Sequence, residues 1–142
     1  THPPASPSPH REHFPAVYLK LNHNADALES LEMEHGIHPH EILFVFDDIH
    51  DLSLAKEAGC SFLIPNPGAR MFERYCRENK LCDYITKNSG GNNAVREISE
   101  VVLGMLGLFT KTVENRMSFS EIYTDYLQMR NLQKTKIREL KY

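Results

Sequence analysis

Apolar and polar positions alternate in blocks that predict a succession of strands and helices. Residues 42–46, Ile-Leu-Phe-Val-Phe, are apolar without a break; such a run is typical of a strand covered on both faces, so we expect a central parallel strand here. Further strands are expected at 16–21, 60–64 and 83–86, and helices at 25–35, 52–58 and 69–79. Because strand and helix alternate, the sequence predicts an α/β domain with a parallel sheet and helices on both faces.

The last third of the chain is predicted to be helical. Apolar residues at helical spacing indicate a helix at 94–109, and Ser118-Phe-Ser-Glu121 is a capping-box pattern that indicates a second helix start. An apolar stripe at helical spacing follows, formed by Phe119, Ile122, Tyr123, Tyr126 and Leu127. It predicts a helix that either packs on its own domain or binds a partner. The basic residues 133–142 are expected to fray.

These patterns divide the chain into three parts. Residues 1–15 hold five prolines and are expected to form a disordered arm. Residues 16–109 form the predicted α/β domain, and residues 118–142 form a helical extension.

Composition narrows the classes of function. The formal net charge of −3 argues against nucleic-acid binding, which needs clustered basic residues. No apolar run approaches the roughly 18 residues of a membrane span, so we expect a cytoplasmic protein without membrane contacts. The three cysteines, Cys60, Cys76 and Cys82, have no paired spacing, which supports neither a disulfide framework nor a zinc site.

Three carboxylates follow the apolar run at 42–46. Asp47, Asp48 and Asp51 fall where a parallel sheet binds its ligands, at the carboxyl ends of its strands. Oxygen ligands of this kind suit magnesium (Mg), which would offset the concentrated negative charge. The alternative is that Asp48 or Asp51 caps the helix expected near Leu52 while Asp47 is solvated.

Two motifs resemble a known family. The first motif is Phe46-Asp-Asp-Ile-His-Asp51, which resembles the fourth motif of the haloacid dehalogenase superfamily, usually Gly-Asp-Asp-x-x-Asp. The second is Ser89-Gly-Gly-Asn-Asn-Ala-Val-Arg-Glu97. It resembles the Gly-Gly-x-Gly-Ala-x-Arg-Glu segment of the capless 3-deoxy-manno-octulosonate 8-phosphate phosphatases in that superfamily. The same segment occurs in related domains attached to acylneuraminate cytidylyltransferases. The resemblance covers about residues 16–108 and implies a Rossmannoid three-layer sandwich, here with an extra C-terminal helix.

The resemblance implies a Mg-dependent hydrolase, a phosphatase of sugar-acid phosphates that assembles as a homotetramer. It implies that Asp47 is a metal ligand, that Asp48 and Asp51 support it, and that Arg96 lies near the substrate. Asn24 occupies the position of the family's catalytic and substrate-binding lysine, and Phe46 replaces the usual glycine. The Asp-x-Asp-Gly-Thr segment that carries the family's nucleophile is absent from these 142 residues.

Two functions therefore stay open. The chain is either part of a phosphatase whose nucleophile lies outside these residues, or a catalytically degenerate pseudoenzyme, a phosphatase-like module that serves oligomerisation or partner binding. The missing motif is compatible with both, whereas Asn24 and Phe46 favour the second.

Overall fold

The structure is a computed structural model that describes residues 13–19 and 25–139. It divides into two compact units. One spans Asn22–Gly107, and the other joins Thr1–Leu21 to Leu108–Tyr142. The expected arm at 1–12 lies outside the described residues.

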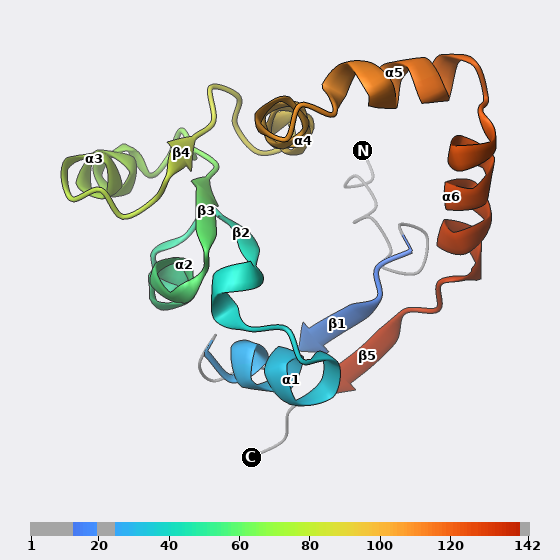
Figure 1. Cartoon of the computed structure of the whole chain (residues 1–142). Helices are drawn as coiled ribbons and strands as arrows, with labels where there is room; N and C mark the ends of the chain where they lie inside the picture. The colour runs from blue at the N-terminus through green and yellow to red at the C-terminus, as the bar shows by residue number, and fades with distance from the viewer. Residues whose placement is uncertain (1–12, 20–24, 140–142) are drawn as a thin grey trace, which may run out of the picture. The chain divides into compact units, whose positions relative to one another are not determined.

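A three-stranded parallel sheet forms the centre of the unit Asn22–Gly107 (Figure 1). Its strands are β2 (Leu43–Phe46), β3 (Cys60–Leu63) and β4 (Tyr84–Ile85), in that order. Between β2 and β3 the chain forms the short 3₁₀-helix η2 (Ile49–Asp51) and α2 (Leu52–Glu57), and α3 (Arg70–Glu78) connects β3 to β4. The expected alternation of strands and helices around a parallel sheet is confirmed.

Helices cover both faces of this sheet, as expected. On one face, Phe46 and Leu63 pack with Ala55 of α2 and Cys76 of α3. On the other face, Phe62 packs against Ala94 and Ile98 of α4 (Ala94–Met105). The period of two along a strand places Phe46 and its neighbour Val45 in opposite layers. The unit is therefore a three-layer α/β structure.

The expected position of the strand at 42–46 is wrong. Within the described residues β2 pairs only with β3, so it is an edge strand, and Leu43 at its start is exposed. β3 is the central strand, and Phe62 and Leu63 are almost fully buried. An unbroken apolar run cannot distinguish the two positions, because an edge strand covered by helices on both faces has the same pattern.

The helix expected at 25–35 is confirmed as α1 (Ala25–His35). It ends because Gly36 adopts a positive φ of 65°, which residues with a side chain rarely adopt. The amides of Gly36 and Ile37 then donate to the carbonyls of Glu32 (2.8 Å) and Leu31 (3.4 Å), which satisfies the last turn of the helix. The 3₁₀-helix η1 (Pro39–Glu41) leads from there into β2.

The helices of the C-terminal part differ from several expectations. The helix expected at 94–109 ends earlier, because Gly107 has a φ of 68° and a separate helix, α5 (Phe109–Met117), follows. The next helix, α6 (Glu121–Leu132), is capped by Ser120, whose hydroxyl accepts from the amide of Tyr123 (3.3 Å). Ser118 instead donates to the carbonyl of Glu114 at the end of α5.

The expectation that the C-terminal residues fray is wrong for residues 136–139. Lys136–Glu139 forms β5, which pairs in parallel with β1 (Ala16–Leu19) in a second sheet. Pairing with a strand 120 residues away in sequence, Ala16 with Lys136, is a non-local contact that a local charge pattern cannot reveal. The structure thus groups the first strand with the C-terminal helices, whereas the sequence placed it in the domain at 16–109.

The apolar stripe of α6 is only partly covered by the described residues. Neither α5 nor α6 has a buried residue; Ile122 and Tyr126 are 62% and 55% exposed, whereas Tyr123 and Leu127 are half-buried. None of the helices in the described part of the chain has the length and apolar character needed to cross a membrane.

Candidate functional site

Among the described residues, the three candidate carboxylates do not form a group that could hold a metal ion. Asp51 is half-buried and is the last residue of η2. Asp47 directly follows β2 and is exposed to solvent. The Asp48 carboxylate accepts a hydrogen bond from the amide of His50 (3.0 Å), so Asp48 caps η2. Its Oδ1 also lies 3.9 Å from Nε2 of His50. Asp48 therefore has a capping role, as in the alternative left open by the sequence, but it caps η2 and not the helix α2 that begins at Leu52.

The residues present do not form a complete magnesium site. Within residues 13–19 and 25–139, no group of three or more His, Cys, Asp or Glu side chains is arranged to hold a metal ion. Magnesium needs oxygen ligands in near-octahedral geometry. Asp47 alone supplies too few of these from the protein, even when waters complete the shell. Asp47 could contribute one ligand to a site that other residues complete.

The remaining candidates from the sequence lie apart from such a site. Asn24 falls outside the described residues. Arg96 is exposed on α4 and forms an ion pair with Glu100, one turn further along the helix (3.1 Å). Phe46 is 3% exposed and meets the ring of Phe72 edge to face, 6.5 Å between centroids, so it is a core residue.

Glu97, which follows Arg96 in the second motif, organises the loop after β4. Its carboxylate accepts hydrogen bonds from the amides of Lys87 (2.9 and 3.1 Å) and Asn88 (3.0 Å). It also accepts from the side-chain amide of Asn88 (2.8 Å) and from the hydroxyl of Tyr84 (3.0 Å). Glu97 thus joins the loop to the start of α4, a role that the sequence analysis did not assign.

These hydrogen bonds shift the pKa values of Glu97 and Tyr84. Donation from the Lys87 amide, followed by the donors on Asn88 and Tyr84, lowers the pKa of Glu97 although burial acts in the opposite direction. The hydrogen bond that the Tyr84 hydroxyl donates to Glu97 raises the pKa of that hydroxyl, and burial adds to the effect. The carboxylate form of Glu97 is therefore the form that this loop stabilises.

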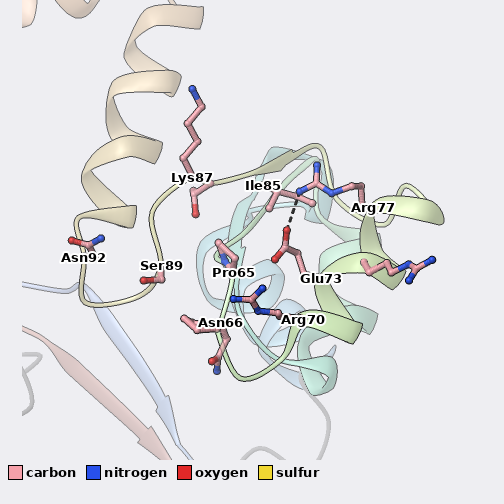
Figure 2. Close-up of a pocket in the computed structure, with 12 residues that line it drawn as sticks. Pro65, Asn66, Arg70, Glu73, Arg77, Ile85, Lys87, Ser89 and Asn92 are labelled. Carbon is pink, nitrogen blue, oxygen red and sulfur yellow. Dashed lines mark hydrogen bonds and ion pairs between the residues drawn. The ribbon is translucent and has the colours of Figure 1, made fainter.

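A cavity of about 810 Å³ lies between α3 and this loop, beyond the carboxyl ends of β3 and β4 (Figure 2). Among the described residues that line it, the charged side chains are mostly basic: Arg70, Arg74, Arg77 and Lys87, with Glu73 as the acidic one. The sequence held a signal for this surface, because Arg70, Arg74 and Arg77 recur at helical spacing and so share one face of α3. Asp47, Asp48, Asp51 and Arg96 are not among the residues that line it.

The basic residues of the cavity differ in their partners. Arg74 pairs with Glu78 (2.8 Å), and Arg77 pairs with Glu73 (2.9 Å), the interaction drawn as a dashed line in Figure 2. Arg70 and Lys87 form no ion pair with any residue in the described ranges 13–19 and 25–139. The cavity therefore keeps uncompensated positive charge.

The cysteines have no arrangement for redox or metal chemistry. All three are free thiols, and Cys76 is fully buried in the core. Burial raises the pKa of each thiol, with the Asp83 carboxylate adding to the effect at Cys60. A raised pKa keeps a thiol protonated and unreactive at neutral pH, so these residues act as small core side chains.

The fold and the cavity define an α/β domain of three layers with a parallel sheet and a basic pocket at its carboxyl edge. Among solved structures, the chain is similar to the crystal structure of a hypothetical protein from Xanthomonas campestris, with 26% sequence identity and a TM-score of 0.54. The match covers 67% of this chain and 48% of that one, so the chain spans about half the length of its structural relative. No family model matches the chain, and the curated proteins contain no match either. The structural match supports the α/β fold.

Proposed function

We propose that the chain is part of a haloacid dehalogenase-like phosphatase that hydrolyses sugar-acid phosphates with magnesium. The observation that carries this proposal is the position of Asp47, directly after β2 at the carboxyl edge of a parallel sheet. The segment 89–97 supports it, because it leads into α4, which covers the same sheet.

In this proposal Asp47 is one ligand of magnesium, and the nucleophile comes from outside the 142 residues. The sequence contains no Asp-x-Asp pair, and covalent phosphoryl transfer in this family needs such a carboxylate. The other magnesium ligands come from outside residues 13–19 and 25–139, because those residues do not complete the site.

Phosphate release tests this proposal. The longest reading frame that contains these residues is incubated with 3-deoxy-manno-octulosonate 8-phosphate or an acylneuraminate phosphate, with and without magnesium. We expect magnesium-dependent turnover that Asp47→Asn lowers by more than about tenfold, since even indirect partners of a catalytic metal contribute that much. Asp125→Asn, which removes an exposed carboxylate on α6, is the matched control. Absence of turnover, or full activity of Asp47→Asn, contradicts the proposal.

A second candidate, a non-catalytic module for self-association, is favoured by two observations. Phe46 fills the core where the family has glycine, and Asp48 is engaged as a cap. In addition, α5 and α6 carry exposed apolar residues, a feature that often marks a surface buried on association. A homotetramer of this kind would bury the stripe of α6.

Light scattering in solution tests this second function. The mass of one chain is 16.3 kDa, and we expect a species of about four times that mass at micromolar concentration. Ile122→Asp places a charge in the exposed stripe and should lower the mass towards that of the monomer, whereas Thr124→Asp, outside the stripe, should not. A strictly monomeric wild type contradicts self-association.

A further inference from the structure

The basic cavity beside α3 shares no lining residue with the candidate carboxylates Asp47, Asp48 and Asp51. It is formed by the loop after β3, by α3, and by the loop after β4. Arg96 does not line it either, whereas Ser89 and Asn92 of the segment 89–97 do. It is large enough for a ligand, since small-molecule pockets commonly measure about 300–1,000 Å³.

Several hydrogen-bond donors in the cavity have no partner within the described part of the chain. They are the guanidinium of Arg70, the hydroxyl of Ser89 and the side-chain amide of Asn92, which make no side-chain hydrogen bond or ion pair there. Figure 2 shows Arg70 extending from α3 towards the side where Ser89 and Asn92 lie on the opposite loop. Donors thus approach the cavity from two walls.

Other polar groups of the lining already have partners. The Asn66 side-chain oxygen accepts from the amide of Gly68 (2.9 Å), and the Thr86 hydroxyl donates to the carbonyl of Asn88 (2.7 Å). Arg74 and Arg77 are held in ion pairs along α3. These contacts shape the walls and leave Arg70, Ser89 and Asn92 available to a ligand.

The charge of the cavity suits a dianion. After pairing, Arg70 and Lys87 contribute two positive charges without an acidic partner among the described residues. A guanidinium binds a phosphate through two parallel hydrogen bonds, and a phosphate monoester carries close to two negative charges at neutral pH. In Figure 2 the Lys87 ammonium points away from Arg70, so Lys87 acts mainly through its charge.

The loop wall is fixed before a ligand arrives. Glu97 holds the amides of Lys87 and Asn88, which places Ser89 opposite α3, and Pro65 stiffens the other loop. Pre-organised donors cost less entropy on binding than mobile ones. Pro65 and Ile85 add apolar surface, which suits a ligand with an organic body beyond its phosphate.

We propose that this cavity binds a small organic phosphate. Arg70 holds the phosphate oxygens through its fork, Ser89 and Asn92 donate from the loop, and the carbon body lies over Pro65 and Ile85. No bond is made or broken at this site, which binds the ligand and does not act on it.

Titration of the full chain with glucose 6-phosphate tests the proposal, without magnesium and at constant ionic strength. Binding is followed by amide NMR shifts, with inorganic phosphate and acetate as comparison ligands. We expect saturable shifts at Ser89 and Asn92 below about 10 mM, weaker binding of inorganic phosphate, and no saturation by acetate. Because the assay reads binding and not turnover, a failed phosphatase assay leaves its outcome unaffected.

Two variants locate the site. Arg70→Gln should weaken glucose 6-phosphate binding by at least about tenfold, and Ser89→Ala by a smaller factor, because a charged bidentate contact exceeds a neutral one. Arg130→Gln removes an exposed arginine of α6 that does not line the cavity and should leave the affinity unchanged. Affinity of Arg70→Gln within twofold of wild type, equal binding of acetate, or absence of saturable shifts overturns the proposal.

Discussion

The side chain of Glu97 fixes the loop after β4, and it does so only as a carboxylate. Its pKa is lowered by the donors around it, so the folded state binds this proton less tightly than the unfolded chain does. The stability that Glu97 contributes is therefore fully present above its unfolded pKa of about 4.3. It is lost as the pH falls through the lower, folded pKa.

We predict that Glu97→Gln lowers stability at neutral pH and flattens the fall of stability in acid. Denaturant unfolding from pH 7 down to pH 3 measures both effects. Glu100→Gln is the control, because Glu100 also lies on α4 but only pairs with the exposed Arg96. Equal acid sensitivity of the Glu97 variant and wild type would show that the loop does not depend on this carboxylate.

Phe46 is a stabilising core residue, whether or not the adjacent Asp47 binds magnesium. We predict that Phe46→Ala costs about 3–5 kcal/mol, because it removes a buried ring that packs on Phe72, Leu63 and Cys76. Phe119→Ala, at an exposed phenylalanine, should change stability by less than about 1 kcal/mol. Urea unfolding of both variants measures the difference; similar costs would contradict the placement of Phe46 in the core.

Between α2 and β3, Gly59 passes so close to η1 that no side chain fits. A Cβ atom built there would lie 1.8 Å from the carbonyl oxygen of His40, and this neighbour is backbone that cannot rotate away. We predict that Gly59→Ala destabilises by about 1–3 kcal/mol, as overpacking does. Gly104→Ala, inside α4 with open space around it, should stabilise by about 0.5–1 kcal/mol. Thermal or urea unfolding should show opposite signs, and a shared sign would sink this prediction.

The local elements were predictable from the sequence where a single pattern decides them. Helix 25–35 with its terminal glycine, and strand 60–64, agree with α1 and β3 within a residue or two. The break at Gly107 was missed because the apolar pattern continues through it, while the backbone turns to a positive φ. The pairing of Ala16 with Lys136 was missed because it depends on contacts that are distant in sequence.

The candidate site was predictable only in part, for a related reason. The sequence places Asp47 at the end of a strand, and the structure agrees. It cannot say that Asp48 turns back to the amide of His50, because one Asp serves equally as cap or as ligand. The roles of Arg70 and Glu97 depend on which backbone and side chains surround them, and that information appears only once the loop after β4 is placed.

At the scale of the whole molecule, the buried core belongs to one unit. Every buried apolar residue of the described chain falls between Leu28 and Ile98, while α5 and α6 contribute none. Segments with few buried contacts open with low free energy, whereas core strands open only when the whole unit unfolds. The two units therefore differ in the free energy that protects their backbone amides.

We predict that amide hydrogen exchange is slowest in β3 and much faster in α6. β3 is the central strand, hydrogen-bonded on both sides, and Phe62 and Leu63 are 1% exposed, whereas α6 has no buried residue. Exchange followed by mass spectrometry at several protein concentrations measures this. If the stripe of α6 is buried in an oligomer, its protection should rise with concentration, because association stabilises by mass action, while that of β3 should not change. Slow exchange of α6 at the lowest concentration, equal to that of β3, would mean that its own chain already covers the stripe.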